Sequence, residues 1–232
     1  MASEQSRVKT AARLRTTRVI ARWRRWAWIL AVVALAGGTV VGVPAIHEPI
    51  LRTAGWVLVV DEPVERTDII VVAIDAVGGV LEAADLVQSG IAARVAIFAD
   101  PPDAVDQEFI RRGIPYEDGA ARLARQLGSL GVTAIEQIPR VDGTEAEGQV
   151  LPDWCDEHRF RSIVVLSSPD HSRRLRRVLD RSMKGHQTKV TIRVVRRWGF
   201  DPDRWWKTRV GIRTEIIELQ KLLLDIVRHP IS

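Results

Sequence analysis

The chain has 232 residues, of which 46% are hydrophobic and 27% are charged. This composition supplies a buried core and excludes general disorder, and the length allows one domain of ordinary size plus an appendage. The single cysteine, Cys155, excludes an internal disulfide and a cysteine-clustered zinc site. A net charge of +5 suggests a nucleic-acid binder at first, but the position of the charges along the chain argues against one.

The N-terminal residues have the pattern of a membrane anchor. Residues 1–25 carry eight basic side chains and one acid, so the rest of the chain has a net charge of −2. Residues 26–46 contain no ionisable group, and about 20 helical residues cross a bilayer core. Because basic flanks stay cytoplasmic, we predict a cytoplasmic leader over 1–25 and a single transmembrane helix over 26–46 in the plasma (inner) membrane. The remainder is then extracytoplasmic, and its partner is the phospholipid bilayer rather than nucleic acid.

Two other interpretations of the apolar segment stay open. Ala34-Leu35-Ala36 has the small-x-small form of a signal-peptidase site, and cleavage after Ala36 would release the rest of the chain. The second interpretation is that the segment is a buried helix of a soluble protein, although such helices rarely carry a basic leader. The apolar run continues past Ala36 to Val43, which favours a retained anchor.

After a connecting segment at 47–67, apolar runs alternate with helical patterns. Short β-prone runs predict strands at 68–74, 94–98, 134–138, 162–167 and 189–195. Apolar residues at helical spacing predict helices at 80–90, 116–130, 144–157 and 172–183, and 100–113 is expected to be mostly loop. This alternation predicts an α/β fold over 68–232, a three-layer Rossmann-like parallel sheet of about five strands.

A C-terminal amphipathic helix is predicted over 205–227. Its apolar residues Ile212, Ile216, Leu219, Leu223 and Ile226 lie along one face, which predicts that this face packs on the domain. In the alternative interpretation, Trp205 and Trp206 with the neighbouring basic residues contact the membrane.

The candidate site follows from the rule that ligands bind beyond the carboxyl ends of the strands in an open parallel sheet. The polar and glycine residues that follow the predicted strands are Asp75, Gly78, Gly79, Glu117, Thr144, Glu147, Ser167, Ser168, His171, Arg173 and Arg174.

The residues from Ser167 to Arg174, which follow the fourth predicted strand, give the strongest indication of a ligand site. Serine hydroxyls, an imidazole and helix N–H groups, with two arginines beside them, favour a phosphate or carboxylate ligand. We expect His171 and Asp75 to be the catalytic residues, and Arg174 with Arg173 to hold the anion. The structural alternative is that these residues only cap helices, since Thr144 and Glu147 also have the spacing of a capping box.

Cofactor motifs give no assignment. The sequence contains no dinucleotide-binding fingerprint and no Walker A motif, and His47, His158, His186 and His229 lack metal-ligand spacing. No metal is therefore predicted, and the cofactor stays unknown.

The order of the motifs carries a resemblance to a known family. After the predicted anchor come Glu82-Ala83-Ala84, Gly143-Thr144-x-Ala146-Glu147, Asp170-His171-x-x-Arg174, Trp205-Trp206, and a helix with Glu218 and Lys221. Over roughly residues 50–228 this order resembles the ElyC/SanA/YdcF family of bacterial envelope proteins. Two departures are the absence of an arginine between the first strand and Arg94, and altered residues near Thr144.

The resemblance implies an inner-membrane anchor, a Rossmann-like domain and a role in peptidoglycan or lipid-carrier homeostasis. It implies that His171, Arg174 and Thr144 are site residues. We expect binding of an anionic small molecule or lipid-linked sugar that bears phosphate, with hydrolysis or transfer left open. The alternatives are a non-catalytic envelope scaffold and an S-adenosylmethionine- or nucleotide-binding protein.

Overall fold

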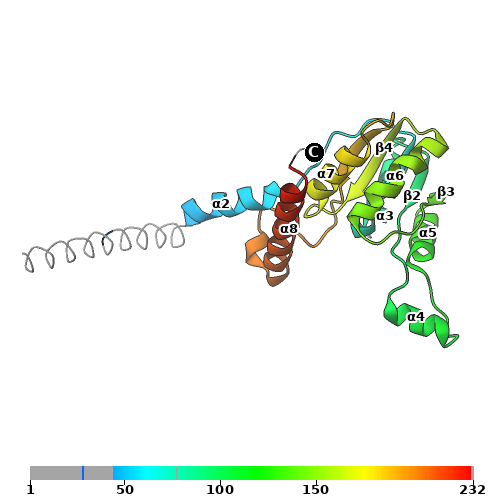
Figure 1. Ribbon diagram of the computed structural model, residues 1–232, viewed down its shortest axis with the longest axis horizontal. Helices are drawn as coiled ribbons and strands as arrows, with labels where there is room; N and C mark the ends of the chain where they lie inside the picture. Colours follow the sequence, from blue (N-terminus) through cyan, green and yellow to red (C-terminus); the bar gives the residue numbers. More distant parts are fainter. Residues whose placement is uncertain (1–27, 29–43, 77, 231–232) are drawn as a thin grey trace, which may run out of the picture. The chain divides into compact units, whose positions relative to one another are not determined.

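The computed structural model describes residues 28, 44–76 and 78–230 of the chain (Figure 1). The predicted leader, nearly all of the predicted transmembrane helix and the Ala36 cleavage site lie outside these residues. Among the helices that are described, none is both long enough and apolar enough to cross a membrane. The chain divides into two compact units at residue 51, and the unit from Arg52 to Ser232 contains the sheet and the candidate site.

This unit is built on a five-stranded parallel sheet, as predicted. The strands are β1 (Ile69–Val72), β2 (Arg94–Ile97), β3 (Ala134–Gln137), β4 (Ser162–Ser167) and β5 (Lys189–Val194), in the order β3-β2-β1-β4-β5. In the centre, Val71 of β1 lies between Ala96 of β2 and Val165 of β4. All four residues of β1 are buried because both faces of the sheet are covered, so the strand is apolar throughout. The fold class is α/β and Rossmann-like.

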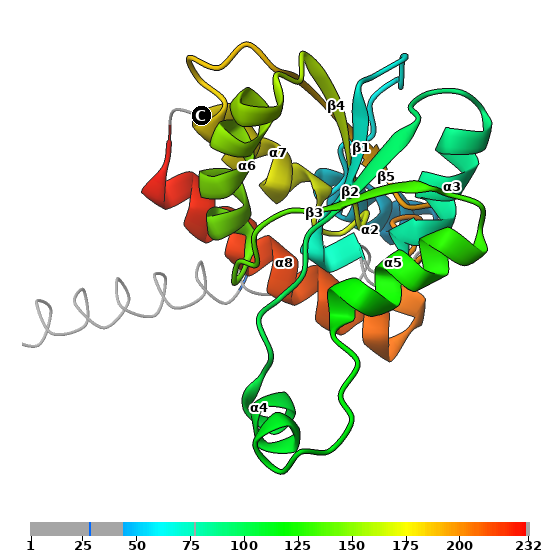
Figure 2. The same cartoon turned by 90° about the vertical axis from the view of Figure 1, so that its right-hand side faces the viewer.

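Helices cover both faces of the sheet. Helix α3 (Gly79–Gln88) packs against α5 (Gly119–Ser129), and α6 (Thr144–His158) packs against α7 (Ser172–Ser182). Figure 2 shows the two pairs on opposite sides of the strands, which makes the predicted three layers. A Cβ atom on Gly148 of α6 would lie 2.5 Å from Val178 of α7, so the close approach of these helices requires glycine there.

The remaining helices lie outside the layers. Helix α4 (Ala104–Arg111) forms within the expected loop, where a capping box between Asp103 and Asp106 starts it, and it projects from the sheet in Figures 1 and 2. Helix α2 (Pro44–Val57) occupies the start of the expected connecting segment. The short helices are η1 (Ile74–Ala76) and η2 (Trp205–Lys207), and α8 (Arg209–Arg228) ends the chain.

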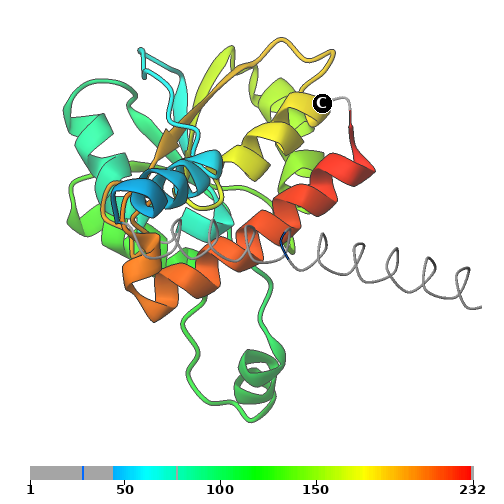
Figure 3. The same cartoon turned by 90° about the vertical axis from the view of Figure 1, so that its left-hand side faces the viewer.

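Helix α8 packs on the domain, but the predicted packing face is wrong. The side that faces the domain carries the buried residues Gly211, Glu215, Glu218, Leu222 and Asp225. Of the five residues of the predicted face, Leu219 is partly buried and packs against the cluster of Leu58, Phe200 and Leu222, whereas Ile212, Ile216, Leu223 and Ile226 are 40–62% exposed. The reason is that the arginines of α7 attract the acids of α8, because Arg177 and Arg181 both pair with Asp225. Figure 3 shows α8 running across this side of the domain.

Candidate functional site

The strand order reverses between β1 and β4, and ligands bind at such points in open α/β sheets. A cavity of about 220 Å³ lies there. Its lining residues are Ile74, Asp75, Gly143, Thr144, Glu147, Ser168, Asp170, His171, Arg174, Trp198, Glu218 and Lys221. The predicted residues Asp75, Thr144, Glu147, Ser168, His171 and Arg174 thus converge on one pocket, and Ser167 reaches it through Asp75.

His171 is the buried N-cap residue of α7, and both of its ring nitrogens contact polar neighbours. Its Nδ1 lies 2.7 Å from Arg174 Nη2 and 3.5 Å from Glu218 Oε2, and its Nε2 lies 3.0 Å from Thr144 Oγ1. A guanidinium only donates hydrogen bonds, so Nδ1 accepts from Arg174 in the shorter contact. The proton is then on Nε2, which donates to Thr144. This arrangement makes His171 a group that orients Thr144.

The Thr144 hydroxyl is left with one hydrogen to donate. Its oxygen accepts from His171 Nε2 and from Arg174 Nη1, each at 3.0 Å, which uses the two acceptor positions of a hydroxyl. The residue that caps α6 is Gly143, whose φ of 79° favours glycine, and no side chain caps the helix. The capping box suggested by the spacing of Thr144 and Glu147 is therefore not formed, and both side chains contribute to the pocket.

Glu147 is the carboxyl group of the pocket that titrates near neutral pH. It is buried, and its Oε1 accepts a hydrogen bond from the backbone N–H of Ile74 at 2.8 Å. Burial raises the pKa of Glu147 to about 7, and the charge of Asp75 adds to this effect, although the Ile74 hydrogen bond and His171 oppose it. A carboxyl with this pKa can both donate and accept a proton under physiological conditions.

Two further carboxylates offer acceptor oxygens. Asp75 Oδ2 accepts from Ser167 Oγ at 3.2 Å, from the Ser168 N–H at 3.1 Å and from Ser168 Oγ at 2.5 Å. Asp75 Oδ1 and Asp170 Oδ1 are buried and have no hydrogen-bond partner among the described residues. Burial raises the pKa of Asp170, and Glu218 and Asp75 add to this. Buried acceptors of this kind are expected to find a donor, which a ligand hydroxyl would supply.

Helix α8 contributes two pocket residues that were absent from the predicted site, Glu218 and Lys221. Glu218 Oε2 lies 3.4 Å from Arg174 Nη2, and Glu218 Oε1 accepts from Lys221 Nζ at 2.7 Å. Burial alone would raise the pKa of Glu218, but the hydrogen bond from Lys221 and the charge of Arg174 outweigh burial and lower it to about 2. Their spacing by three residues is typical of an ordinary surface pair on a helix, and the motif order behind the family resemblance was the one signal that included them.

Four predicted site residues lie outside the pocket. Arg173 donates to the backbone carbonyls of Val57 and Val59, so it does not form an anion clamp with Arg174. Gly78 and Gly79 lie at the start of α3. Glu117 pairs with Arg125 at 2.7 Å and lines a separate cavity of about 230 Å³.

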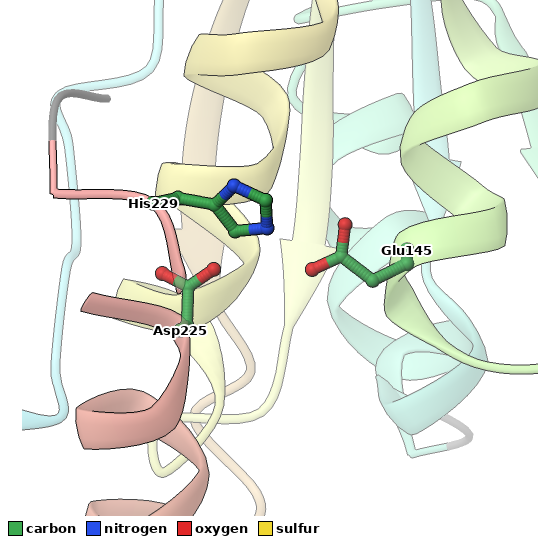
Figure 4. Close-up of side chains that lie close together, drawn as sticks. All are labelled: Glu145, Asp225 and His229. Atoms are coloured by element: carbon green, nitrogen blue, oxygen red, sulfur yellow. The ribbon is translucent and has the colours of Figure 1, made fainter. Parts of the chain in front are cut away.

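A cluster of possible metal ligands lies between α6 and the end of α8. Figure 4 shows Glu145, Asp225 and His229, which each offer a ligand atom within 4.8 Å of the others. Asp225 already pairs with Arg177 at 2.5 Å and with Arg181 at 2.8 Å. Two guanidinium groups on one carboxylate repel a cation, so we assign no metal to this cluster.

A larger cavity, also beside the sheet, lacks a chemical centre. It has a volume of about 610 Å³ and lies along α7 and β5. Most of its charged groups are paired with each other, Arg176 with Glu62 and Asp180, and Lys189 with Glu65. The 220 Å³ pocket at β1 and β4 is therefore the candidate site.

Comparison with known proteins adds one structural likeness. No family model matches the chain, and no curated protein matches it. Among solved structures, the chain is similar to a universal stress protein from Archaeoglobus fulgidus, with a TM-score of 0.35 and 14% sequence identity. The alignment covers 55% of this chain and 93% of that protein.

Proposed function

We propose that this chain is a membrane-anchored, extracytoplasmic α/β protein of the cell envelope that binds a small phosphorylated sugar in the His171 pocket and hydrolyses or transfers it. The observation that carries the proposal is the convergence of Thr144, His171, Arg174 and Lys221 on one cavity where the strand order reverses. The envelope location rests on the predicted anchor and on the resemblance to the ElyC/SanA/YdcF family.

The phosphate would bind at the end of the pocket formed by α6, α7 and α8. Lys221 supplies an ammonium group that is about half exposed, and Thr144 supplies the hydroxyl hydrogen left over from its contacts with His171 and Arg174. Helix α6 begins at Thr144, and the N-terminus of a helix attracts anions. These donors suit the oxygens of a phosphate group.

The sugar would bind at the other end. Asp75 Oδ1 and Asp170 Oδ1 are acceptors without partners, which suits a ligand that carries several hydroxyl groups. Trp198 lines the pocket and is 38% exposed, so its ring offers an apolar wall to a sugar ring. Pockets for drug-sized ligands have volumes of about 300–1,000 Å³. A volume of about 220 Å³ therefore favours a single phosphorylated sugar over a whole nucleotide.

Glu147 is the group that we assign to proton transfer. Its pKa of about 7 suits a general acid or base at neutral pH, and it lines the pocket together with Thr144 one helical turn away. The expected role of His171 changes accordingly, because both of its ring nitrogens are engaged by neighbouring side chains. The same engagement favours the alternative of a binding protein without catalysis, in which His171 and Arg174 only shape the pocket.

Calorimetric titration of the full-length chain in non-ionic detergent tests the proposal. The probes are glucose 1-phosphate, glucose and inorganic phosphate, and the variants are Lys221→Gln and, as a matched control, the exposed Lys184→Gln. We expect the phosphorylated sugar to bind more tightly than either fragment. Loss of one charge-assisted hydrogen bond should weaken binding about tenfold in Lys221→Gln and leave Lys184→Gln unchanged.

Failure of the wild type to bind any of the three probes, or equal affinities of Lys221→Gln and wild type, would remove the proposal. Release of inorganic phosphate from the bound sugar phosphate separates the enzyme from the binding protein.

A further inference from the structure

Helix α8 buries its polar side and exposes its apolar side. The residues that face the domain recur at positions 211, 215, 218, 222 and 225, and every acidic residue of the helix is among them. The opposite side carries Ile212, Ile216, Ile217, Leu223, Leu224 and Val227, which are between 36% and 70% exposed. A soluble surface helix has the reverse pattern, with its apolar stripe on the core. The exposed side of α8 is therefore an apolar surface that needs an occupant.

The charged residues that α8 itself exposes are all basic. Arg209, Arg213 and Arg228 are exposed, whereas Glu215, Glu218 and Asp225 are turned into the domain. An apolar stripe with flanking basic groups and no acid is typical of helices that lie in a membrane interface, because arginine binds anionic headgroups while the apolar side chains enter the acyl boundary.

The start of the domain packs directly against the segment that leads into α8. The domain begins at Arg52, whose guanidinium pairs with Asp203 at 3.2 Å, and Trp56 donates to the same carboxylate at 3.0 Å. A side chain on Gly55 would collide with Pro202 and Trp205, so this segment packs directly against η2, which leads into α8.

We propose that α8 lies on the surface of a bilayer that contains anionic lipids, with its exposed apolar side in the headgroup region. This inference is independent of the ligand pocket. A second copy of the chain is the less favourable occupant, since a symmetric pairing of this surface would bring the arginines of both copies together.

Lipid-attached quenchers test the contact in the full-length chain. In a Cys155→Ser background, single cysteines replace Ile216 or Leu223 on α8, or Ala121 on α5 as the exposed control, and each carries an environment-sensitive fluorophore. The chains are reconstituted into vesicles of phosphatidylcholine with or without phosphatidylglycerol, at about one protein per vesicle. The quencher is a nitroxide placed near the headgroup.

We expect both α8 labels to be quenched roughly threefold or more above the α5 label in vesicles with phosphatidylglycerol. The excess should fall in pure phosphatidylcholine and in Arg209→Gln/Arg213→Gln. Quenching of the α8 labels equal to that of the control overturns the proposal. It is also overturned if the labels are shielded only when several proteins share a vesicle, because that result identifies a second copy as the occupant.

Discussion

Replacement of Glu218 by glutamine is expected to destabilise the domain by about 3 kcal/mol at pH 7. An unperturbed glutamate titrates near 4.5, and the hydrogen bond from Lys221 and the charge of Arg174 outweigh burial and lower the pKa of Glu218 to about 2. Each pH unit between the two values corresponds to about 1.4 kcal/mol of stability. The Glu218 side chain is 10% exposed, whereas its partner Lys221 is 51% exposed, so solvent screens part of the interaction and the expected loss is set below the full value of the pKa difference. Removal of one member of a buried ion pair costs a similar amount, about 3–5 kcal/mol.

The sign of the pH dependence follows from the lowered pKa. The stabilisation is fully present above pH 4.5 and is lost as the pH falls towards 2, because the folded state resists protonation more strongly than the unfolded state. The difference between wild type and Glu218→Gln should therefore fall to less than half of its neutral value at pH 3.

Urea unfolding of the full-length chain in non-ionic detergent, followed by tryptophan fluorescence at pH 7 and pH 3, measures both quantities. The control is Glu117→Gln, which breaks the exposed pair with Arg125 and should change the free energy of unfolding by less than about 0.5 kcal/mol at either pH. The reasoning is refuted if Glu218→Gln behaves like this control, or if its destabilisation is the same at both pH values.

Two further substitutions test the other shifted carboxyl groups. Glu147→Gln should remove the inflection near pH 7 from the pH profile of the affinity or turnover of a sugar phosphate. The ligand phosphate itself titrates near pH 6, so the wild-type profile minus the variant profile isolates the contribution of Glu147. Identical profiles of wild type and variant would exclude the assigned role. Glu215 is fully buried and has no hydrogen-bond partner among the described residues. Burial raises the pKa of Glu215 to about 7. Ionisation of Glu215 therefore lowers the free energy of unfolding progressively as the pH rises from 4.5 to about 7. Glu215→Gln should therefore raise the free energy of unfolding by about 2 kcal/mol at pH 8 and leave it unchanged at pH 4, and a destabilised variant at pH 8 would show that the ionised carboxylate has a partner.

The strands and most helices were predictable because their signals are local. The runs at 69–72 and 162–167 are apolar since both faces of a central parallel strand are buried, and the helix over 144–158 was predicted to within one residue. Helix α4 was missed as a full element because its eight residues bury nothing, so it has no core-facing stripe to reveal it.

The site was predictable in part, for a different reason. The rule that ligands bind at strand ends identified Asp75, Thr144, Glu147, His171 and Arg174 before their contacts were known. It could not separate Arg173 from Arg174, since neighbouring residues on a helix point about 100° apart and only one of the two faces the cavity.

The sequence by itself determined the layers of this protein and the edge of the sheet at which chemistry is possible, because periodicity and strand ends are encoded by residues close together in the chain. The tertiary structure alone decided which face of α8 packs on the domain. Its apolar stripe predicts an inward face, yet Arg174, Arg177 and Arg181 of α7 draw Glu218 and Asp225 inward. Ion pairs between residues more than 40 positions apart produce no periodic pattern in the sequence of either helix. These pairs complete the pocket with Glu218 and Lys221, and they leave the apolar side of α8 exposed.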